Sequence, residues 1–137
     1  MGDYFTQSHY LLASQADHVF LHPEGGVSLM GFGVYRTYLR QFLENIKVKF
    51  HVFRAGENKS AVEPYLRDDM SPQERKVVGQ WLNSLWRDYT ELVEKGRNME
   101  PGSVTAFIND FPARLEATEG DLARVFLDAG FVDGLLY

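Results

Sequence analysis

One long amphipathic helix constrains the fold of this 137-residue chain more than any other feature of its sequence. A start at Ser71-Pro72 is predicted, because a serine N-cap, a proline at the first helical position and Glu74 three residues after the serine form a capping box. Gly96 is expected to end the helix. The apolar side chains of this helix form a broad stripe along it, which is typical of a core helix; a subunit contact is the alternative interpretation. Its apolar members are Val77, Val78, Trp81, Leu82, Leu85, Trp86, Tyr89, Leu92 and Val93.

Shorter apolar runs before this helix have the length of strands. Residues 18–22 and 27–30 are two such runs, and a turn is expected at Glu24-Gly25-Gly26 between them. Period-two alternation predicts a further strand over residues 48–53. Apolar positions spaced by three and four predict helices over residues 7–16 and 34–46. This order, with short crossovers, predicts an α/β fold in which helices cover a mostly parallel sheet.

The segment after the long helix predicts smaller elements. A helix over residues 99–111 is expected to end before Pro112, because proline disrupts a helix interior. Asp121 as N-cap and Gly130 beyond the end predict a helix over residues 122–129. Residues 131–137 are expected to form a final strand or turn.

Composition excludes several classes of protein. The net charge of -5 and the absence of a basic stripe argue against a nucleic-acid partner. The absence of cysteine excludes disulfides and thiolate catalysis. His18 and His22 lack a third ligand, and Asp68-Asp69 suit a helix N-terminus, so neither a metal nor another cofactor is predicted. The length fits one domain over residues 1–137, and no run is apolar enough to span a membrane.

One lysine follows the predicted strand over residues 48–53. Gly56 permits a turn, small residues beside Lys59 leave its ammonium group accessible, and Pro64 closes the segment. On base rates a lysine in a loop is a solvated charge. The residues around Lys59 change that interpretation.

The string Arg54-Ala-Gly-Glu-Asn-Lys59-Ser-Ala-Val-Glu-Pro64, followed by Tyr65-Leu-Arg-Asp-Asp-Met-Ser-Pro72, closely resembles the general-base segment of the signal peptide peptidase A (protease IV) family. The resemblance extends over nearly the whole chain. It implies a crotonase/Clp-protease-like fold and a membrane-bound serine endopeptidase with a Ser/Lys dyad, in which Lys59 is the general base. It also implies that this chain is a fragment of the N-terminal half of the long form. Further matching positions are Tyr10–Ser14, Ala16-Asp17, His22-Pro23, Gly31-Phe32, Trp81 and Trp86.

The same resemblance bears on the nucleophile. In the serine-bearing half of the family the nucleophile lies in an Ala-Ser-Gly-Gly-Tyr motif. When that motif is laid on Thr6-Gln-Ser-His-Tyr10, its serine falls on Gln7, which cannot act as a nucleophile. Ser8 as a shifted nucleophile is the alternative, although Ser8 and His9 would diverge on a helix. The chain is therefore expected to lack the nucleophile, and by itself to be inactive.

The implied function is the degradation of cleaved signal peptides at the periplasmic face of the bacterial inner membrane. The expected partners are peptide substrates, the serine-bearing C-terminal half and further copies in a homo-oligomer, with membrane association through segments outside this chain. Apolar surface is expected to remain exposed and to drive self-association. The alternative function is a non-catalytic crotonase-like assembly module, which requires no serine from another segment.

Overall fold

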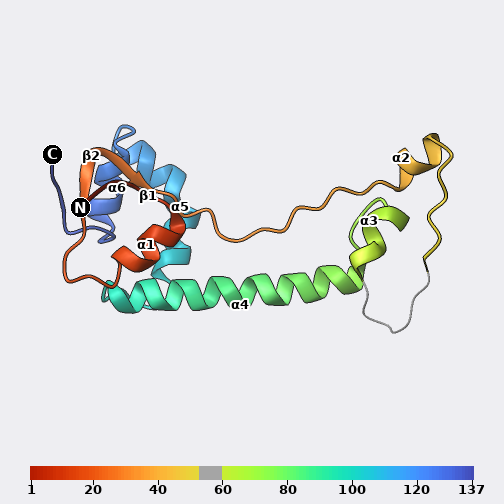
Figure 1. Ribbon diagram of the computed structural model, residues 1–137. Coiled ribbons are helices and arrows are strands. Elements are labelled where there is room, and N and C mark those ends of the chain that lie inside the picture. Colours follow the sequence, from red (N-terminus) through yellow and green to blue (C-terminus); the bar gives the residue numbers. More distant parts are fainter. Residues whose placement is uncertain (53–59) are drawn as a thin grey trace. The chain divides into compact units, whose positions relative to one another are not determined.

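The computed structural model describes residues 1–52 and 60–137 (Figure 1). By its contacts the chain divides into a first unit, Met1–Gly31 with Leu85–Tyr137, and a second unit, Phe32–Ser84. Compactness alone does not make a separately folding domain, and one domain over residues 1–137 stays a prediction. The described elements are β1 (Gly2–Phe5), α1 (Gln7–Ala13), β2 (Phe20–Val27), α2 (Arg40–Asn45), the 3-10 helix η1 (Ser60–Val62), α3 (Glu63–Leu66), α4 (Pro72–Gly96), α5 (Ser103–Ala117), α6 (Leu122–Asp128) and β3 (Gly134–Leu135).

The first unit contains a small parallel sheet. Its strand order is β1-β2-β3, and β2 pairs in parallel with both neighbours. The predicted combination of a parallel sheet with helices is confirmed in the described part of the chain. The strand β1 was not predicted, because a run of four residues at the start of the sequence carries little periodicity.

The predicted turn at Glu24-Gly25-Gly26 is wrong, because both glycines lie within β2. Gly2 pairs with Leu21 and Tyr4 with Gly26, so a step of two residues in β1 faces a step of five in β2. A Cβ on Gly25 would lie 2.0 Å from the Asp3 carbonyl oxygen, and one on Gly26 would lie 2.6 Å from the Leu122 side chain. The absence of a side chain at the two glycines therefore lets the neighbouring strand and α6 approach closely. Close approach of another segment is a common reason for glycine in a strand.

Helix α1 supplies the central side chain of the core. Tyr10 is fully buried, and its hydroxyl donates to the Phe131 carbonyl oxygen at 2.6 Å. Its ring packs against the Phe131 ring with centroids 5.7 Å apart. Phe107 and Phe126 extend this aromatic cluster. The fully buried tyrosine is thus tolerated because its polar end has a partner.

Helix α5 continues through Pro112, so the prediction that it ends before this proline is wrong. Proline removes one backbone donor and costs roughly 3 kcal/mol inside a helix. Phe107 is buried and Phe111 partly buried before Pro112, and Leu115 is partly buried after it. The Arg114 guanidinium lies 5.6 Å from the centre of the Phe107 ring. Packing of these side chains offsets the cost of the proline.

Helix α4 ends at Gly96, as predicted. Met99 N–H donates to the Glu94 carbonyl at 2.8 Å and Asn98, at φ 52°, donates to the Lys95 carbonyl at 3.4 Å, which together form a Schellman motif. A Cβ on Gly96 would lie 2.3 Å from the Ser14 carbonyl oxygen. Gly96 therefore allows α4 to contact the end of α1, whereas the left-handed residue that follows the helix is Asn98. The predicted features of α6 are confirmed, because the Asp121 side chain accepts from Arg124 N–H and Gly130 has φ 77°.

The second unit departs most from the prediction. The helix expected over residues 34–46 is present only as α2, and the strand expected over residues 48–53 is not found in its described part, residues 48–52. A short helix needs an apolar face packed against a neighbour, yet Tyr35 is 97% exposed. A strand needs a partner for its backbone groups, and among the described residues the sheet contains only β1, β2 and β3.

Among the described residues, the buried core lies in the first unit. Within α4 the predicted core role is confirmed for Tyr89 and Val93, whereas Val77 and Trp81 are more than half exposed. The prediction of exposed apolar surface is confirmed, and in the second unit that surface comprises Phe32, Tyr35, Phe42, Ile46, Val48, Phe50, Tyr65, Val77 and Trp81. Within the described residues, none of the helices has the length and apolar character needed to cross a bilayer.

Candidate active site

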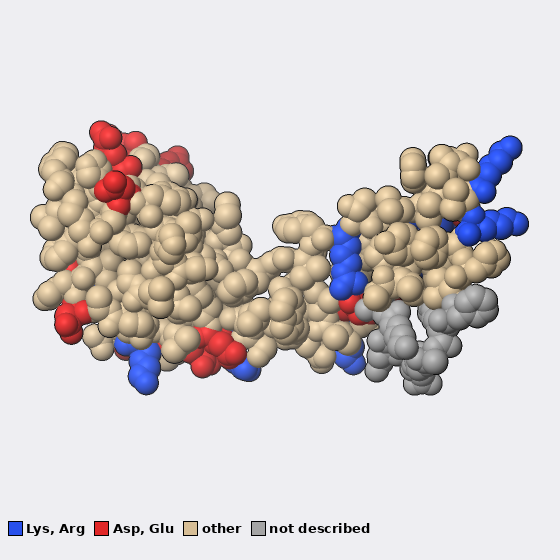
Figure 2. Space-filling model, in the orientation of Figure 1, with Lys and Arg blue, Asp and Glu red and all other residues tan. Residues whose placement is uncertain are grey.

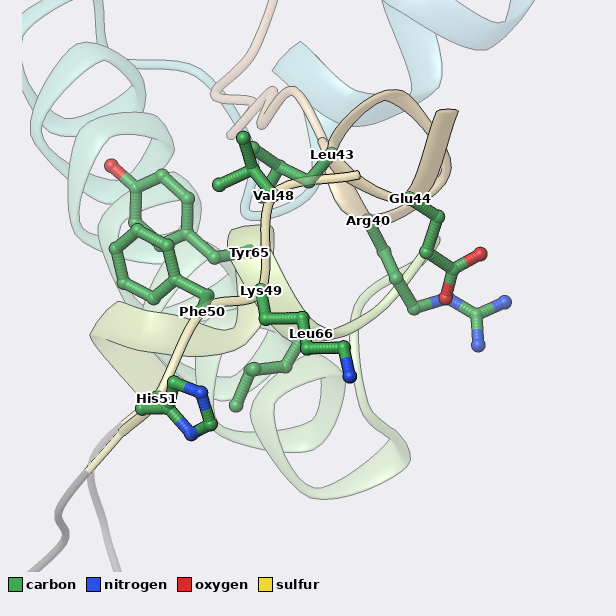
Figure 3. A pocket seen from close by; sticks show the side chains of 9 residues that line it. All are labelled: Arg40, Leu43, Glu44, Val48, Lys49, Phe50, His51, Tyr65 and Leu66. Carbon is green, nitrogen blue, oxygen red and sulfur yellow. The ribbon is translucent and has the colours of Figure 1, made fainter. Parts of the chain in front are cut away.

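The predicted base Lys59 lies outside the described residues, and so does the rest of the interval 53–59. The structure does describe the residues on both sides of this interval. These flanking residues line a pocket of about 330 Å³ in the second unit (Figure 3). The candidate site is therefore built from Val48–His51, which precede the interval, and from Tyr65-Leu66, which follow it.

An aromatic pair joins the two flanks of the interval. The Phe50 and Tyr65 rings stack with centroids 4.6 Å apart and planes 7° apart. In Figure 3 the two rings lie face to face, while the Lys49 side chain leaves the chain on the other side. Offset stacking of this kind is worth about 1 kcal/mol beyond burial. The pair therefore holds the chain before residue 53 close to the chain after residue 60.

The flank after the interval is anchored by backbone contacts. Leu39 N–H donates to the Pro64 carbonyl at 2.7 Å, which ties the residue before α2 to α3. Ser71 N–H donates to the Glu63 carboxylate at 3.1 Å, and the hydrogen bond with Ser71 lowers the pKa of Glu63 from its ordinary value. Glu63 and Ser71 thus fix the turn between α3 and α4.

The predicted capping box at the start of α4 is half confirmed. The Ser71 hydroxyl accepts from Glu74 N–H at 3.2 Å, as expected. The reciprocal bond to Ser71 N–H comes from Glu63, and the Glu74 carboxylate instead lies 3.0 Å from the Arg36 guanidinium. A long-range ion pair has replaced a local contact, which residue spacing cannot predict.

The two aspartates before α4 each have an arginine partner. Asp68 accepts from the Arg40 guanidinium, and this hydrogen bond lowers the pKa of the Asp68 carboxyl. Asp69 accepts from Arg67 at 3.1 Å. The positions of Asp68 and Asp69 are therefore explained by these two ion pairs as well as by the dipole of the following helix.

The charges of the two units are opposite in sign. The first unit has 13 acidic and 5 basic side chains and a net charge of -8, whereas the second has 6 acidic and 9 basic ones and a net charge of +3. On the face in Figure 2, acidic side chains are spread over the first unit and basic ones are prominent on the second. The pocket also has more basic than acidic side chains among its described lining residues, which include Arg40, Lys49 and His51 beside Glu44. The overall charge of -5 conceals this difference.

Gln7 occupies the position matched to the nucleophile, and both the oxygen and the nitrogen of its side-chain amide form hydrogen bonds. It is the first residue of α1, directly after β1 and the N-cap Thr6. The Gln7 Oε1 atom accepts from Met30 N–H at 3.1 Å and from Gly31 N–H at 2.9 Å, and Nε2 donates to the Gly31 carbonyl at 3.2 Å. Ser8, the alternative, is exposed on α1.

The histidines considered as metal ligands have other contacts. His22 Nδ1 accepts from Glu24 N–H at 3.2 Å, and its ring meets the Tyr137 ring edge to face. The His18 ring lies 6.2 Å from the Phe20 ring. In residues 1–52 and 60–137 no three potential ligands come together to hold a metal ion.

Residue patterns alone missed several polar contacts between separate segments of the first unit. Arg97 forms a two-point contact with Asp133, at 2.8 and 3.0 Å, and Asp133 also accepts from Val19 N–H at 2.6 Å. Buried Glu94 accepts from Val104 N–H at 3.0 Å, near the start of α5. The Arg97 and Asp133 partners lie 36 residues apart, so no local signal announces them.

Comparison with known proteins decides the family. The sequence pattern described as Peptidase family S49 matches residues 1–133. The chain belongs to peptidase family S49. This S49 chain is similar to Protease 4 of Salmonella typhi, with 38% identity over 135 residues, which is 98% of this chain and 22% of that protein. It is also similar to Protease 4 of Haemophilus influenzae, with 33% identity over 131 residues, which is 96% of this chain and 21% of that protein. It therefore spans about one fifth of the length of these relatives.

Proposed function

We propose that this chain is the lysine-bearing part of a serine endopeptidase with a crotonase-like fold and a Ser/Lys dyad. In this proposal Lys59 is the general base, and another part of a longer protein supplies the serine. The observation that carries it is the S49 match over residues 1–133, joined to the resemblance of the Lys59 segment to a general-base segment.

The chemistry and the hydrogen bonds of the Gln7 side chain support the proposal that another segment supplies the nucleophile. Its side-chain amide is bound to Met30 and Gly31, and an amide cannot attack a peptide carbonyl. The relatives are about five times as long as this chain, which leaves ample sequence for a second segment. The serine would then reach Lys59 from outside residues 1–137.

The surroundings of the pocket support a buried lysine in the complete protein. A lysine is a base only when it is neutral, and its unperturbed pKa of about 10.4 must therefore be lowered by burial. Lowering it by about 3 units corresponds to about 4 kcal/mol. The exposed side chains of Phe50, Tyr65 and Trp81 offer apolar surface that a partner segment would cover, and so exclude water from this unit.

The substrate proposal follows the family resemblance. Cleaved signal peptides are apolar, and exposed aromatic side chains on the second unit suit an apolar peptide. Action at the periplasmic face of the inner membrane, anchoring by other segments and assembly into a homo-oligomer complete the proposal.

The decisive experiment replaces Lys59 in the full-length enzyme and measures peptide hydrolysis. Lys59→Arg should abolish turnover, because a guanidinium stays protonated and cannot accept the serine proton. Lys59→Ala should be equally inactive with the fold retained. The matched control is Lys47→Ala, at an exposed lysine that is not among the residues lining the pocket, and its rate should stay within about twofold of the parent. Lys59→Arg activity within about tenfold of the parent, a barrier change of about 1.4 kcal/mol, would remove Lys59 from the mechanism.

The competing function is a non-catalytic assembly module, which the exposed apolar side chains of the second unit also fit. The two functions differ in one requirement. A peptidase needs a serine in an Ala-Ser-Gly-Gly-Tyr motif elsewhere in the parent reading frame, whereas a module needs none. Sequencing that reading frame distinguishes them.

A further inference from the structure

The contact between Gln7 and the end of the segment after β2 has the form of an oxygen-binding site. Two successive backbone N–H groups, those of Met30 and Gly31, converge on one oxygen atom, Gln7 Oε1, at 3.1 and 2.9 Å. Successive N–H groups that point into one concavity bind anions and partly charged oxygens. The feature is thus a pair of donors with a single acceptor placed between them.

The backbone of Gly31 makes this convergence possible. Gly31 has φ 73°, a conformation that glycine adopts without steric cost. The site also lies at the surface, since Met30 is 90% exposed and no described atom beyond the adjacent residues comes within 4 Å of where a Cβ on Gly31 would stand. A small ligand could therefore reach the two N–H groups if Gln7 were absent.

Gln7 is held at the site through both its side chain and its backbone. The side-chain Nε2 donates to the Gly31 carbonyl at 3.2 Å, and the backbone carbonyl oxygen of Gln7 accepts from the Tyr89 hydroxyl at 3.1 Å. An acceptor tethered in the same chain has a high effective concentration at the donors. A free carbonyl or carboxylate oxygen would have to displace it.

We propose that the Met30 and Gly31 N–H groups form an oxyanion-type site, and that Gln7 keeps this site closed. The ligand of the opened site is a carboxylate or a polarised carbonyl oxygen. Acyl-transfer sites place such paired donors beside the nucleophile, where they stabilise the developing negative oxygen. The link to catalysis rests on the proposed function, through the match of Gln7 to the nucleophile, whereas the oxygen-binding geometry does not depend on it.

Nuclear magnetic resonance of the 137-residue chain tests the proposal without any peptidase activity. Acetate is titrated at constant ionic strength against chloride, and the Met30 and Gly31 amide signals are followed. The parent should show no saturable shift, whereas Gln7→Ala should show one at both amides. Exchange of the Gly31 amide with solvent should also accelerate about fivefold in Gln7→Ala, which corresponds to a hydrogen bond of about 1 kcal/mol.

Two further variants complete the experiment. Gln15→Ala is the matched control, because Gln15 is another amide that links segments, by donating to the Leu92 carbonyl at 3.0 Å, and it should leave both amides unchanged. Gln7→Glu keeps an acceptor oxygen and should preserve slow exchange at Gly31 even if Gln7→Ala fails to fold. Any of three outcomes would overturn the proposal. These are rapid exchange of the Gly31 amide in folded Gln7→Glu, acetate-induced shifts as large in the parent as in Gln7→Ala, and no acetate-induced shift in folded Gln7→Ala. An inactive or active Lys59 variant has no bearing on these outcomes.

Discussion

Removing the carboxylate of Asp133 should destabilise the first unit more than removing one partner of an exposed ion pair. The Arg97 side chain is only 7% exposed, and Asp133→Ala would leave its guanidinium with the Gly130 carbonyl at 3.4 Å. The Val19 N–H would lose its 2.6 Å acceptor as well. Breaking a buried pair costs about 3–5 kcal/mol. Because the Asp133 side chain is 33% exposed, solvent screening reduces this cost, and we expect the unfolding free energy to fall by about 2–3 kcal/mol.

The assay is urea unfolding of the 137-residue chain, followed by circular dichroism. Asp128→Ala is a matched control, because Asp128 also lies 2.8 Å from an arginine, Arg124, but both side chains are at least half exposed. Its cost should be below about 0.5 kcal/mol. The reasoning is refuted if Asp133→Ala costs no more than Asp128→Ala.

The pH dependence provides a second check on Asp133. The hydrogen bond from Arg97 is the main cause that lowers the pKa of Asp133 in the folded chain. A carboxyl with a lowered folded pKa contributes stability above its unfolded pKa of about 3.9, and this contribution is lost as the pH falls through the folded value. The difference in unfolding free energy between the parent and Asp133→Asn should therefore be constant near neutrality and shrink below about pH 4.

Three further predictions concern activity, packing and alkaline stability. The 137-residue chain alone should hydrolyse no fluorogenic peptide, and activity that Ser8→Ala removes would contradict the assignment of Gln7 to the nucleophile's place. Gly25→Ala should cost about 2–3 kcal/mol in urea unfolding, because its Cβ would lie 2.0 Å from the Asp3 carbonyl oxygen. Gly79→Ala in α4 should stabilise by about 1 kcal/mol, because beyond the adjacent residues and the backbone of its own helix no described atom lies within 4 Å of the added Cβ. Equal effects of the two substitutions would contradict this account of Gly25. Burial raises the pKa of Tyr89 to about 12 from 10.0, so its contribution to stability should be complete below pH 10 and be lost as the pH rises toward 12; a tyrosinate absorbance that Tyr89→Phe removes and that titrates near 10 would count against it.

Local sequence signals were sufficient where one residue satisfies a nearby backbone group. Asp121 caps α6, Ser71 caps α4 and Gly130 follows the end of α6, all within a few residues of their partners. Such contacts depend on chemistry and spacing alone, so the sequence determines them. The resemblance of the Lys59 segment likewise needed only the order of residues, and the family match supports it.

Contacts between distant segments were decided only by the tertiary structure. Gly25 and Gly26 suit either a turn or a close approach, and it was the positions of β1 and α6 that selected the second. Pro112 was expected to end a helix, yet aromatic packing on both sides of it carries α5 onward. In the second unit, residues 48–52 alternate as a strand would, but no described strand pairs with them. Periodicity reports which faces of a segment are apolar, whereas a strand exists only where another segment supplies hydrogen-bond partners for its backbone.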